Sequence, residues 1–263
     1  MGVGKMGGSI LRGALKLGAL SAETVWVNDA LPGRAESVAE ELGVHAAESK
    51  REMLANADCV LYAAHPSNLE AALSELSQSG WEPRHWMLSI AAGVATSRLE
   101  SLLPKGAAVV RAMPNIAASV GEAMTCVCGG AHADEKHIAS SERLLSSVGE
   151  TARVEERLMD AVTGLSGSGP AFALVVLEAL ADAGVEIGLP FDQSLLLARQ
   201  TLLGAAVLAA ESEDHPAVWK SRVASPGGST AAGLAALERG GARAALRDAV
   251  HAAAARSKEL GNA

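Results

Sequence analysis

The strongest constraint on the fold is a glycine pattern at the start of this 263-residue chain, where residues 2–7 read Gly-Val-Gly-Lys-Met-Gly. In such a G-x-G-x-x-G motif the missing side chains let backbone amides approach an anionic group, commonly a pyrophosphate, at the amino end of a helix. Ile10, Leu11 and Ala14 then form an apolar stripe at helical spacing, which ends at Gly18. The motif normally follows a β-strand, and the absence of that strand leaves the loop without an anchor. We therefore expect the true start to lie upstream and to encode a strand of about five to seven apolar residues.

Short β-branched runs alternate with helix-length segments in the first part of the chain, and the expected strands are Val25–Val27, Val60–Ala63, Met87–Ile90, Ala108–Val110 and Thr125–Cys128. Such alternation is typical of parallel βαβ units with right-handed crossovers. After Glu156 the sequence has only alanine- and leucine-rich helical segments, broken at Gly164–Gly169, Gly188–Pro190, Ser225–Gly228 and Gly240–Gly241. We predict an α/β Rossmann-like dinucleotide-binding domain that lacks its first strand at residues 1–154, and an all-α dimerisation domain at residues 155–263.

The composition indicates a globular protein that binds a small molecule. Hydrophobic residues make up 49% of the chain, and its net charge of -8 disfavours nucleic acid and anionic membranes as partners. The longest apolar run, Ala171–Leu177, meets Glu178 too early to cross a bilayer, and no basic region followed by an apolar stretch opens the chain. We expect a cytoplasmic protein with no membrane partner. Cys59, Cys126 and Cys128 lack the paired spacing of a zinc site, so we interpret them as reduced core thiols and expect no metal.

Two helical segments, Phe172–Leu180 and Leu195–Leu208, are apolar on nearly every side. A domain of about one hundred residues cannot bury so much apolar surface alone. We therefore expect a homodimer that packs through its helical domains and could assemble into a higher homo-oligomer.

Residues that follow the expected strands are the first candidates for ligand contacts, because ligands of open α/β sheets bind beyond the carboxyl ends of the strands. Asp29 stands about twenty residues after the glycine loop, where an acid can accept hydrogen bonds from an adenosine ribose or can be a plain turn residue. Arg34 could instead meet a 2′-phosphate. His65-Pro66 could be a general acid, a contact on the nicotinamide side or only a helix-entry turn. The small residues Ala91–Gly93 could let a flat ring lie against the backbone, or could form a tight turn.

Two Ser- and Gly-rich loops, Ser166–Pro170 and Ser225–Thr230, each precede an expected helix. Free amides and hydroxyls at a helix N-terminus suit a carboxylate, although Ser and Thr are more often simple N-caps. The presence of two such loops favours an anion site in the helical domain.

Taken together, these segments closely resemble the pyrroline-5-carboxylate reductase family from residue 2 to about residue 260. The most specific stretch, Val223–Glu238, matches the family signature almost throughout, and Ser89–Gly93, Arg111–Met124 and Gly164–Ala171 look like its other hallmark segments. The resemblance implies hydride transfer from NADPH or NADH to the C=N bond of 1-pyrroline-5-carboxylate, which gives L-proline in the last step of proline biosynthesis. It also implies a dimer with interlocked helical domains and a substrate pocket near the subunit interface.

The resemblance further implies site residues by position. Cofactor contacts would be made by the loop residues Gly2, Gly4, Lys5, Met6 and Gly7, and by Asn28, Asp29, Lys50, Ala63, Ala64, His65, Pro66, Ala91, Ala92 and Gly93. Substrate contacts would be made by Met113, Pro114, Asn115, Glu213, Gly227, Gly228, Ser229 and Thr230. Thr230 would be the catalytic residue, because its hydroxyl can hydrogen-bond an imine nitrogen that has taken its proton from water.

Three cofactor-side positions depart from the family pattern. His65 stands where a lysine is usual, and Lys50 where an asparagine often meets the ribose. Asp29 replaces a small hydroxyl or an asparagine and disfavours a 2′-phosphate, whereas Lys50 or Arg34 could reverse that preference. The choice between NADH and NADPH therefore stays open.

Two other functions would also account for parts of the sequence. A β-hydroxyacid dehydrogenase or a related imine reductase usually relies on a lysine early in the second domain, but after Gly169 the chain has none before Lys220. A truncated, non-catalytic remnant or a binding protein could keep the helical dimer without binding a cofactor.

Overall fold

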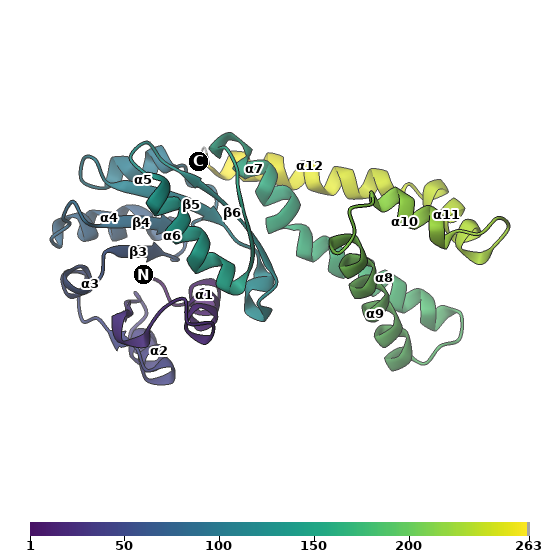
Figure 1. Ribbon diagram of the computed structural model, residues 1–263, viewed down its shortest axis with the longest axis horizontal. Coiled ribbons are helices and arrows are strands. Elements are labelled where there is room, and N and C mark those ends of the chain that lie inside the picture. Colours follow the sequence, from purple (N-terminus) through teal and green to yellow (C-terminus); the bar gives the residue numbers. More distant parts are fainter. Residues whose placement is uncertain (262–263) are drawn as a thin grey trace. The chain divides into compact units, whose positions relative to one another are not determined.

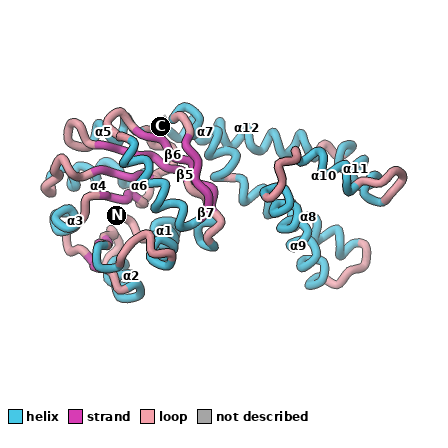
Figure 2. The backbone as a smooth tube through the Cα atoms, viewed as in Figure 1, coloured by secondary structure: helices cyan, strands magenta, loops and turns pink. Residues whose placement is uncertain are grey.

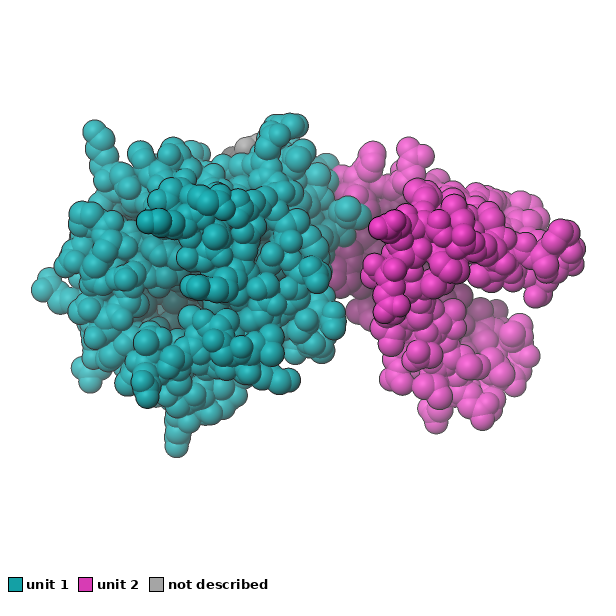
Figure 3. Space-filling model, viewed as in Figure 1, with its two compact units in different colours: residues 1–168, 252–263 teal, residues 169–251 magenta. Residues whose placement is uncertain are grey.

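The computed structural model describes residues 1–261. The described chain forms two compact units, one made of residues 1–168 and 252–261 and the other of residues 169–251 (Figure 3). The last strand ends at Arg153 and helices follow it, as the change in sequence pattern predicted. The domain boundary between residues 154 and 155 stays a prediction.

A five-stranded sheet forms the centre of the first unit (Figures 1 and 2). Its strands lie in chain order: β3 (Cys59–Tyr62), β4 (Trp86–Ser89), β5 (Ala108–Met113), β6 (Ala123–Gly129) and β7 (Gly149–Arg153). The strands β3, β4 and β5 are parallel. Helices α4 (Leu69–Gln78) and α5 (Thr96–Leu102) connect them, as expected for βαβ units.

Strand β6 runs antiparallel to β5, so the expectation that it continues the parallel series is wrong. Only the short helical turn Ile116–Val120 links these strands, and a parallel connection needs a crossover of about a dozen residues or more. Strand β7 is parallel to β6, with α6 (Glu135–Leu145) between them in the chain. The sequence pattern did not predict β7, because its sequence Gly-Glu-Thr-Ala-Arg carries few apolar side chains.

A separate two-stranded parallel sheet pairs β1 (Trp26–Val27) with β2 (His45–Ala46). The sequence pattern did not predict β2, which is only two residues long. Helix α2 (Arg34–Leu42) connects the two strands, α1 (Lys5–Lys16) precedes them and α3 (Lys50–Asn56) follows them.

Backbone hydrogen bonds of Met1 and Gly2 link the two sheets. The amino group of Met1 donates to the Leu61 carbonyl at 2.8 Å, and the Ala63 amide donates to the Met1 carbonyl at 2.8 Å. The Gly2 amide donates to the Asn28 carbonyl at 2.9 Å. The glycine loop is therefore anchored to both sheets, whereas the sequence context suggested no anchor.

Apolar side chains cover both faces of the five-stranded sheet. One cluster packs α4 and α5 against the strands and contains the fully buried Leu73 and Met87. The other packs α1 and α6 against the strands and contains the fully buried Ile10 and Leu88. Neighbouring residues of a strand point to opposite faces, so Met87 belongs to the first cluster and Leu88 to the second. These layers fix the ends of the parallel strands, where the predicted site residues lie.

The second unit is helical throughout, as predicted. Its helices are α8 (Gly169–Glu186), α9 (Phe191–Ala210), α10 (Pro216–Val223), α11 (Ser229–Arg239) and the first half of α12 (Ala242–Gly261). Helices α8 and α9 form a hairpin that turns at Gly188, where φ is +102°. Gly184 lets them approach closely, because a Cβ there would lie 2.0 Å from the Ser194 hydroxyl oxygen.

The regular α-helix is interrupted at the expected break Gly164–Gly169, but by a π-helical turn and not by an open loop. Helix α7 (Met159–Val162) continues through a π-helical turn at Thr163–Gly167 into α8. The Ser168 amide donates to the Thr163 carbonyl at 2.8 Å inside this helical path. The Ser168 amide of the segment Ser166–Pro170 is therefore already satisfied, and the anion site expected there stays a prediction.

Candidate active site

The three glycines of the motif have different surroundings. Gly2 has φ of +84°, and a Cβ on it would lie 2.7 Å from the Ala64 nitrogen. A Cβ on Gly7 would lie 2.2 Å from the Gly2 carbonyl oxygen. A Cβ on Gly4 would meet nothing closer than an Arg34 guanidinium nitrogen at 3.8 Å. Gly2 and Gly7 thus let the loop and α1 pack closely against the end of β3, whereas Gly4 leaves open space at the start of α1.

Helix α1 begins at Lys5, with Gly4 as its N-cap residue. The amides of Lys5 and Met6 lie in the first turn, where a helix offers no intrahelical acceptor. Within residues 1–261 no hydrogen bond uses these two amides. The Lys5 side chain is exposed, and Met6 packs against the core cluster of α1 and α6. Free amides and the positive end of the helix dipole suit an anionic group next to Gly4.

Asp29 connects the loop after β1 to the glycine loop. One of its carboxylate oxygens accepts the Val3 amide at 2.8 Å and the other accepts the Leu31 amide at 2.9 Å. The Arg34 guanidinium lies 3.7 Å away, and the Asp29 side chain is only 7% exposed. Its neighbour Asn28 accepts the Gly2 amide through its carbonyl. Asp29 therefore positions the glycine loop in addition to any contact with a ligand.

A cavity of about 710 Å³ brings together most of the predicted cofactor residues of the first unit. It is lined by Gly2, Gly4, Asn28, Asp29, Lys50, Ala63, Ala64 and His65, and also by Met1, Ala30, Leu31, Arg34, Glu48, Ser49, Asn68, Ala72 and Glu75. Its walls carry the acids Asp29, Glu48 and Glu75 and the cations Arg34 and Lys50. The Lys50 ammonium is bonded to the Glu75 carboxylate. An extended ligand with both anionic and neutral polar parts matches this lining.

Other predicted cofactor residues lie near this cavity without lining it. Pro66 starts a short helical turn, which the exposed His65 caps through its Nδ1 atom. That Nδ1 atom lies 2.9 Å from the Ser67 hydroxyl, and no carboxylate within residues 1–261 hydrogen-bonds the ring. Ala91, Ala92 and Gly93 form the turn after β4, at the same edge of the sheet as the end of β3. A Cβ on Gly93 would lie 3.5 Å from the Gly261 nitrogen at the end of α12.

The predicted substrate residues after β5 are mostly buried or hydrogen-bonded within the protein itself. Met113 ends β5, and Pro114 is buried. Asn115 is also buried, and its side chain donates to the Ser166 carbonyl at 3.1 Å and accepts the Ala117 amide at 3.1 Å. A direct contact of the Asn115 side chain with a substrate would have to use its second N–H or its remaining lone pair, or break one of these bonds.

The loop before α11 has the form expected of an anion site. Gly227 has φ of +70° and Gly228 is the N-cap of α11, so Ser229 and Thr230 form its first turn. Thr230 is partly exposed, which leaves its hydroxyl accessible. Glu213 lines a cavity of about 480 Å³ together with Asp214 and Trp219, and Gly227–Thr230 are not among the residues that line it.

Sequence reasoning missed a polar cluster in the first unit. Glu156 accepts the Thr96 amide at 2.7 Å and the Thr96 hydroxyl at 2.6 Å, and it accepts an Arg111 guanidinium nitrogen at 3.2 Å. Partial burial alone would raise the pKa of Glu156, but the bonds from Thr96 and Arg111 outweigh it and hold this pKa below its ordinary value. These residues come from three segments far apart in the sequence, so no local pattern indicates the cluster.

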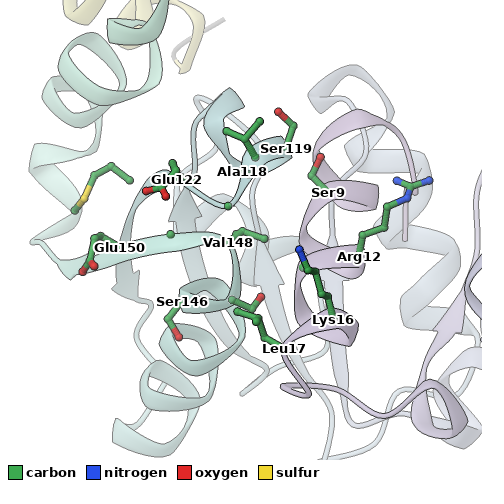
Figure 4. A pocket seen from close by; sticks show the side chains of 17 residues that line it. Ser9, Arg12, Lys16, Leu17, Ala118, Ser119, Glu122, Ser146, Val148 and Glu150 are labelled. Carbon is green, nitrogen blue, oxygen red and sulfur yellow. The ribbon is translucent and has the colours of Figure 1, made fainter. Parts of the chain in front are cut away.

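A second cavity, of about 660 Å³, lies between α1 and the segments around β6 and β7 (Figure 4). Lys16 and Arg12 of α1 line it together with Glu122 and Glu150. Arg12 is already paired with Glu41 at 2.8 Å. This cavity contains none of the predicted site residues and is separate from the cofactor candidate.

Comparison with known proteins identifies the family. Residues 156–260 match the family model described as pyrroline-5-carboxylate reductase dimerisation, and residues 1–93 match the one described as NADP oxidoreductase, coenzyme F420-dependent. A pyrroline-5-carboxylate reductase of Methanosarcina acetivorans is 40% identical over 261 residues, which cover 99% of this chain and 96% of the relative. The chain belongs to the pyrroline-5-carboxylate reductase family.

Further relatives support this assignment across the whole chain. The pyrroline-5-carboxylate reductase of Thermus thermophilus is 42% identical and covers 99% of this chain and 97% of the relative. The solved structure of a pyrroline-5-carboxylate reductase from Coxiella burnetii has a TM-score of 0.92 at 33% identity, with 98% and 96% of the two chains covered. That of the Plasmodium falciparum enzyme with NADP bound has a TM-score of 0.86 at 26% identity, with 99% and 96% covered. The Rossmann-like fold followed by a helical dimerisation domain is thus confirmed, together with the predicted family.

Proposed function

We propose that this chain reduces the C=N bond of 1-pyrroline-5-carboxylate with NADPH or NADH and releases L-proline, as the last step of proline biosynthesis. The observation that carries the proposal is the open glycine loop beside a cavity of about 710 Å³, in a chain whose family relationship spans its whole length. Reduction of a cyclic imine asks mainly for alignment of two rings and a hydrogen-bond partner for the nitrogen.

The residues of the first unit would bind and orient the dinucleotide. The free amides of Lys5 and Met6 and the open side of Gly4 fit a pyrophosphate, because a phosphate needs both close approach and unpaired donors. Asn28, Asp29 and Lys50 would contact the adenosine ribose, and Ala63–Pro66 and Ala91–Gly93 would border the nicotinamide half. When bound, the reduced nicotinamide supplies the hydride that adds to the imine carbon.

The residues of the second unit would bind the substrate carboxylate. The first-turn amides and hydroxyls at Gly227–Thr230 carry partial positive charge at the start of α11, which favours an anion there. The Thr230 hydroxyl would hydrogen-bond the imine nitrogen and so hold the ring for hydride addition. Met113, Pro114 and Asn115 would shape the pocket wall, and Glu213 would lie near the substrate.

A second copy of the chain would cover the apolar surface of the helical unit. Residues 156–186 and 191–210 form helical stretches that are also long and apolar enough to cross a bilayer, by length and composition alone. Leu196 is 53% exposed and Leu203 54% exposed in the single chain. The match to a dimerisation domain favours burial of these side chains in a homodimer or a higher homo-oligomer. We propose a cytoplasmic enzyme without a membrane or nucleic-acid partner.

The test follows NADH and NADPH absorbance with 1-pyrroline-5-carboxylate and measures the L-proline formed by chromatography. We expect turnover with at least one cofactor. A higher kcat/KM with NADH would indicate that Asp29 decides the preference, and a higher kcat/KM with NADPH that Arg34 and Lys50 decide it. A matched control is Gly4→Val, which fills the open space at the start of α1 and should abolish turnover in a folded protein. A folded, dimeric protein that forms no L-proline with either cofactor would contradict the proposed function.

A further inference from the structure

An ion pair between α3 and α4 forms part of the wall of the cavity of about 710 Å³. The ammonium of Lys50, the first residue of α3, is bonded to the carboxylate of Glu75 in α4. The Lys50 side chain is 11% exposed and the Glu75 side chain 65% exposed. Within residues 1–261, Glu75 is the only acid that forms an ion pair with Lys50. A nearly buried ammonium group needs such a partner, because burial of an unpaired charge is costly.

The sheet of β1 and β2 brings this ion pair to the same edge as Asp29. The two strands are parallel neighbours, and the Asn28 side chain after β1 donates to the Ala47 carbonyl after β2 at 3.4 Å. Asp29 and Lys50 therefore both follow the carboxyl ends of adjacent strands, where ligands of such sheets bind. Both residues line the same cavity. The region proposed for the adenosine ribose thus contains Asp29 together with the Lys50–Glu75 pair.

Carboxylates outnumber the Lys and Arg side chains in the lining of this cavity. Asp29, Glu48 and Glu75 line it, against Arg34 and Lys50. The Arg34 guanidinium lies 3.7 Å from the Asp29 carboxylate, and Lys50 is bonded to Glu75, so each cation has an acid beside it. An anionic group that enters this part of the cavity therefore meets cations whose charge is already offset.

The 2′ position of the adenosine ribose is where NADH and NADPH differ. NADH has a hydroxyl there, which can donate to a carboxylate such as that of Asp29, whereas NADPH has a phosphate with a charge of about −1.5 to −2. Asp29 is held in place, because its oxygens accept the Val3 and Leu31 amides. A 2′-phosphate beside it needs a cation, and the Glu75 carboxylate offsets the charge of Lys50 while the two are paired.

We propose that Glu75 is a positioning residue that determines cofactor specificity. By holding the Lys50 ammonium, it withholds the cation that a 2′-phosphate would need, and the cavity binds NADH in preference to NADPH. Glu75 acts through Lys50 and needs no contact of its own with the dinucleotide. This inference rests on the proposed function, because it takes the cavity of about 710 Å³ as the site of the nicotinamide dinucleotide.

The test compares three variants of the full chain with the parent. Glu75→Gln keeps the shape of the side chain and removes its charge. The matched control, Glu48→Gln, removes the same charge from the same cavity but leaves the Lys50–Glu75 pair intact. The third variant combines Glu75→Gln with Lys50→Gln. NADH and NADPH are titrated by fluorescence at constant ionic strength, and calorimetry compares AMP with adenosine 2′,5′-bisphosphate, which adds only the 2′-phosphate.

We expect the parent to bind NADH more tightly than NADPH, and Glu75→Gln to shift the ratio of the two dissociation constants toward NADPH by about tenfold. Glu48→Gln should shift this ratio by about threefold or less, because it frees no cation. The combined variant should lose the shift, since Lys50 is then absent. Thermal unfolding verifies that each variant is folded, and a merely structural role of Glu75 would weaken both dinucleotides alike.

An unchanged ratio in Glu75→Gln would overturn the inference, and so would equal shifts in the two single variants or a parent that prefers NADPH. These binding assays need no imine substrate, so they separate this inference from the proposed function. The expected ratios without formation of L-proline would contradict the proposed function alone. Failure of the folded parent to bind either dinucleotide would overturn the inference itself.

Discussion

Replacing the three motif glycines with alanine, one at a time, separates the packing role of the loop from its ligand-binding role. Gly4→Ala places a methyl group in open space, since its nearest neighbour would be the Arg34 guanidinium at 3.8 Å. The methyl would stand where a pyrophosphate has to approach the amides of Lys5 and Met6. We expect this variant to fold normally but to bind NADH or NADPH at least about tenfold more weakly, which is about 1.4 kcal/mol.

Gly2→Ala and Gly7→Ala should fail for a different reason. The Gly7 methyl would lie 2.2 Å from the Gly2 carbonyl oxygen, and the Gly2 methyl 2.7 Å from the Ala64 nitrogen, both backbone atoms that cannot rotate away. Overpacking of this kind costs about 1–3 kcal/mol. Gly2 also has φ of +84°, and a left-handed conformation adds about 1–2 kcal/mol for alanine. By contrast, loss of glycine at the N-cap position of α1 in Gly4→Ala costs only about 1 kcal/mol or less.

Thermal unfolding and cofactor titration by fluorescence distinguish the two effects. We expect the melting temperature to fall by about 2–12 °C for Gly7→Ala and by about 4–20 °C for Gly2→Ala, because 1 kcal/mol corresponds to about 2–4 °C for a domain of this size. Gly4→Ala should melt within a few degrees of the parent, about 3 °C or less. Gly4→Ala with unchanged cofactor affinity, or Gly7→Ala with unchanged stability, would refute the division of roles among these glycines.

Three further predictions concern other parts of the chain. Thr230→Ala should lower kcat by about 10–100-fold with little change in the cofactor KM, because it removes one hydrogen bond to a charged nitrogen; an unchanged kcat would exclude the catalytic role. Glu156 has a lowered pKa, so its ionised form stabilises the fold above its unfolded pKa of about 4.3, and this stability is lost as the pH falls through the lower folded value. Glu156→Gln should therefore flatten the decline in melting temperature between about pH 6 and pH 3, and a decline as steep as that of the parent would contradict the assignment. Leu196→Asp should shift the protein from dimer to monomer in light scattering, since a charge would enter the proposed interface; a dimer of undiminished affinity would place that interface elsewhere.

The sequence predicted those features of the fold that repeat at short range. The parallel strands β3 to β5 follow from apolar runs separated by helix-length segments, and the helical unit follows from its alanine- and leucine-rich pattern. The direction of β6 depends instead on the length of the link Ile116–Val120, which is too short for a crossover. The segment Gly164–Gly169 departs from the rule that runs of glycine and serine form loops, because both residues are tolerated in a π-helical turn that packing stabilises.

The sequence indicates site residues where a residue type serves a single structural purpose. Glycines that permit close approach are recognisable by spacing, and the structure places Gly2 and Gly7 against the end of β3. Asn115 was selected for its position after β5, but its amide is taken by Ser166 and Ala117, which no spacing rule reveals. The Glu156 cluster was missed for the same reason, since its partners come together only in the folded chain.

The hydrogen bonds of the glycine loop determine which of its amides a ligand can use. The Gly2 amide points inward to the Asn28 carbonyl and the Val3 amide to the Asp29 carboxylate, so both are already satisfied by the end of β1. The free donors therefore begin beyond Val3, at the start of α1, where the helix dipole adds to their effect. Asp29 itself keeps lone pairs for ribose hydroxyls after accepting two amides, but it cannot move toward a ligand without releasing Val3. The Asp29 carboxylate thus stabilises the loop whether or not it contacts a cofactor. Replacement of Asp29 should therefore change both the order of the loop and the cofactor preference.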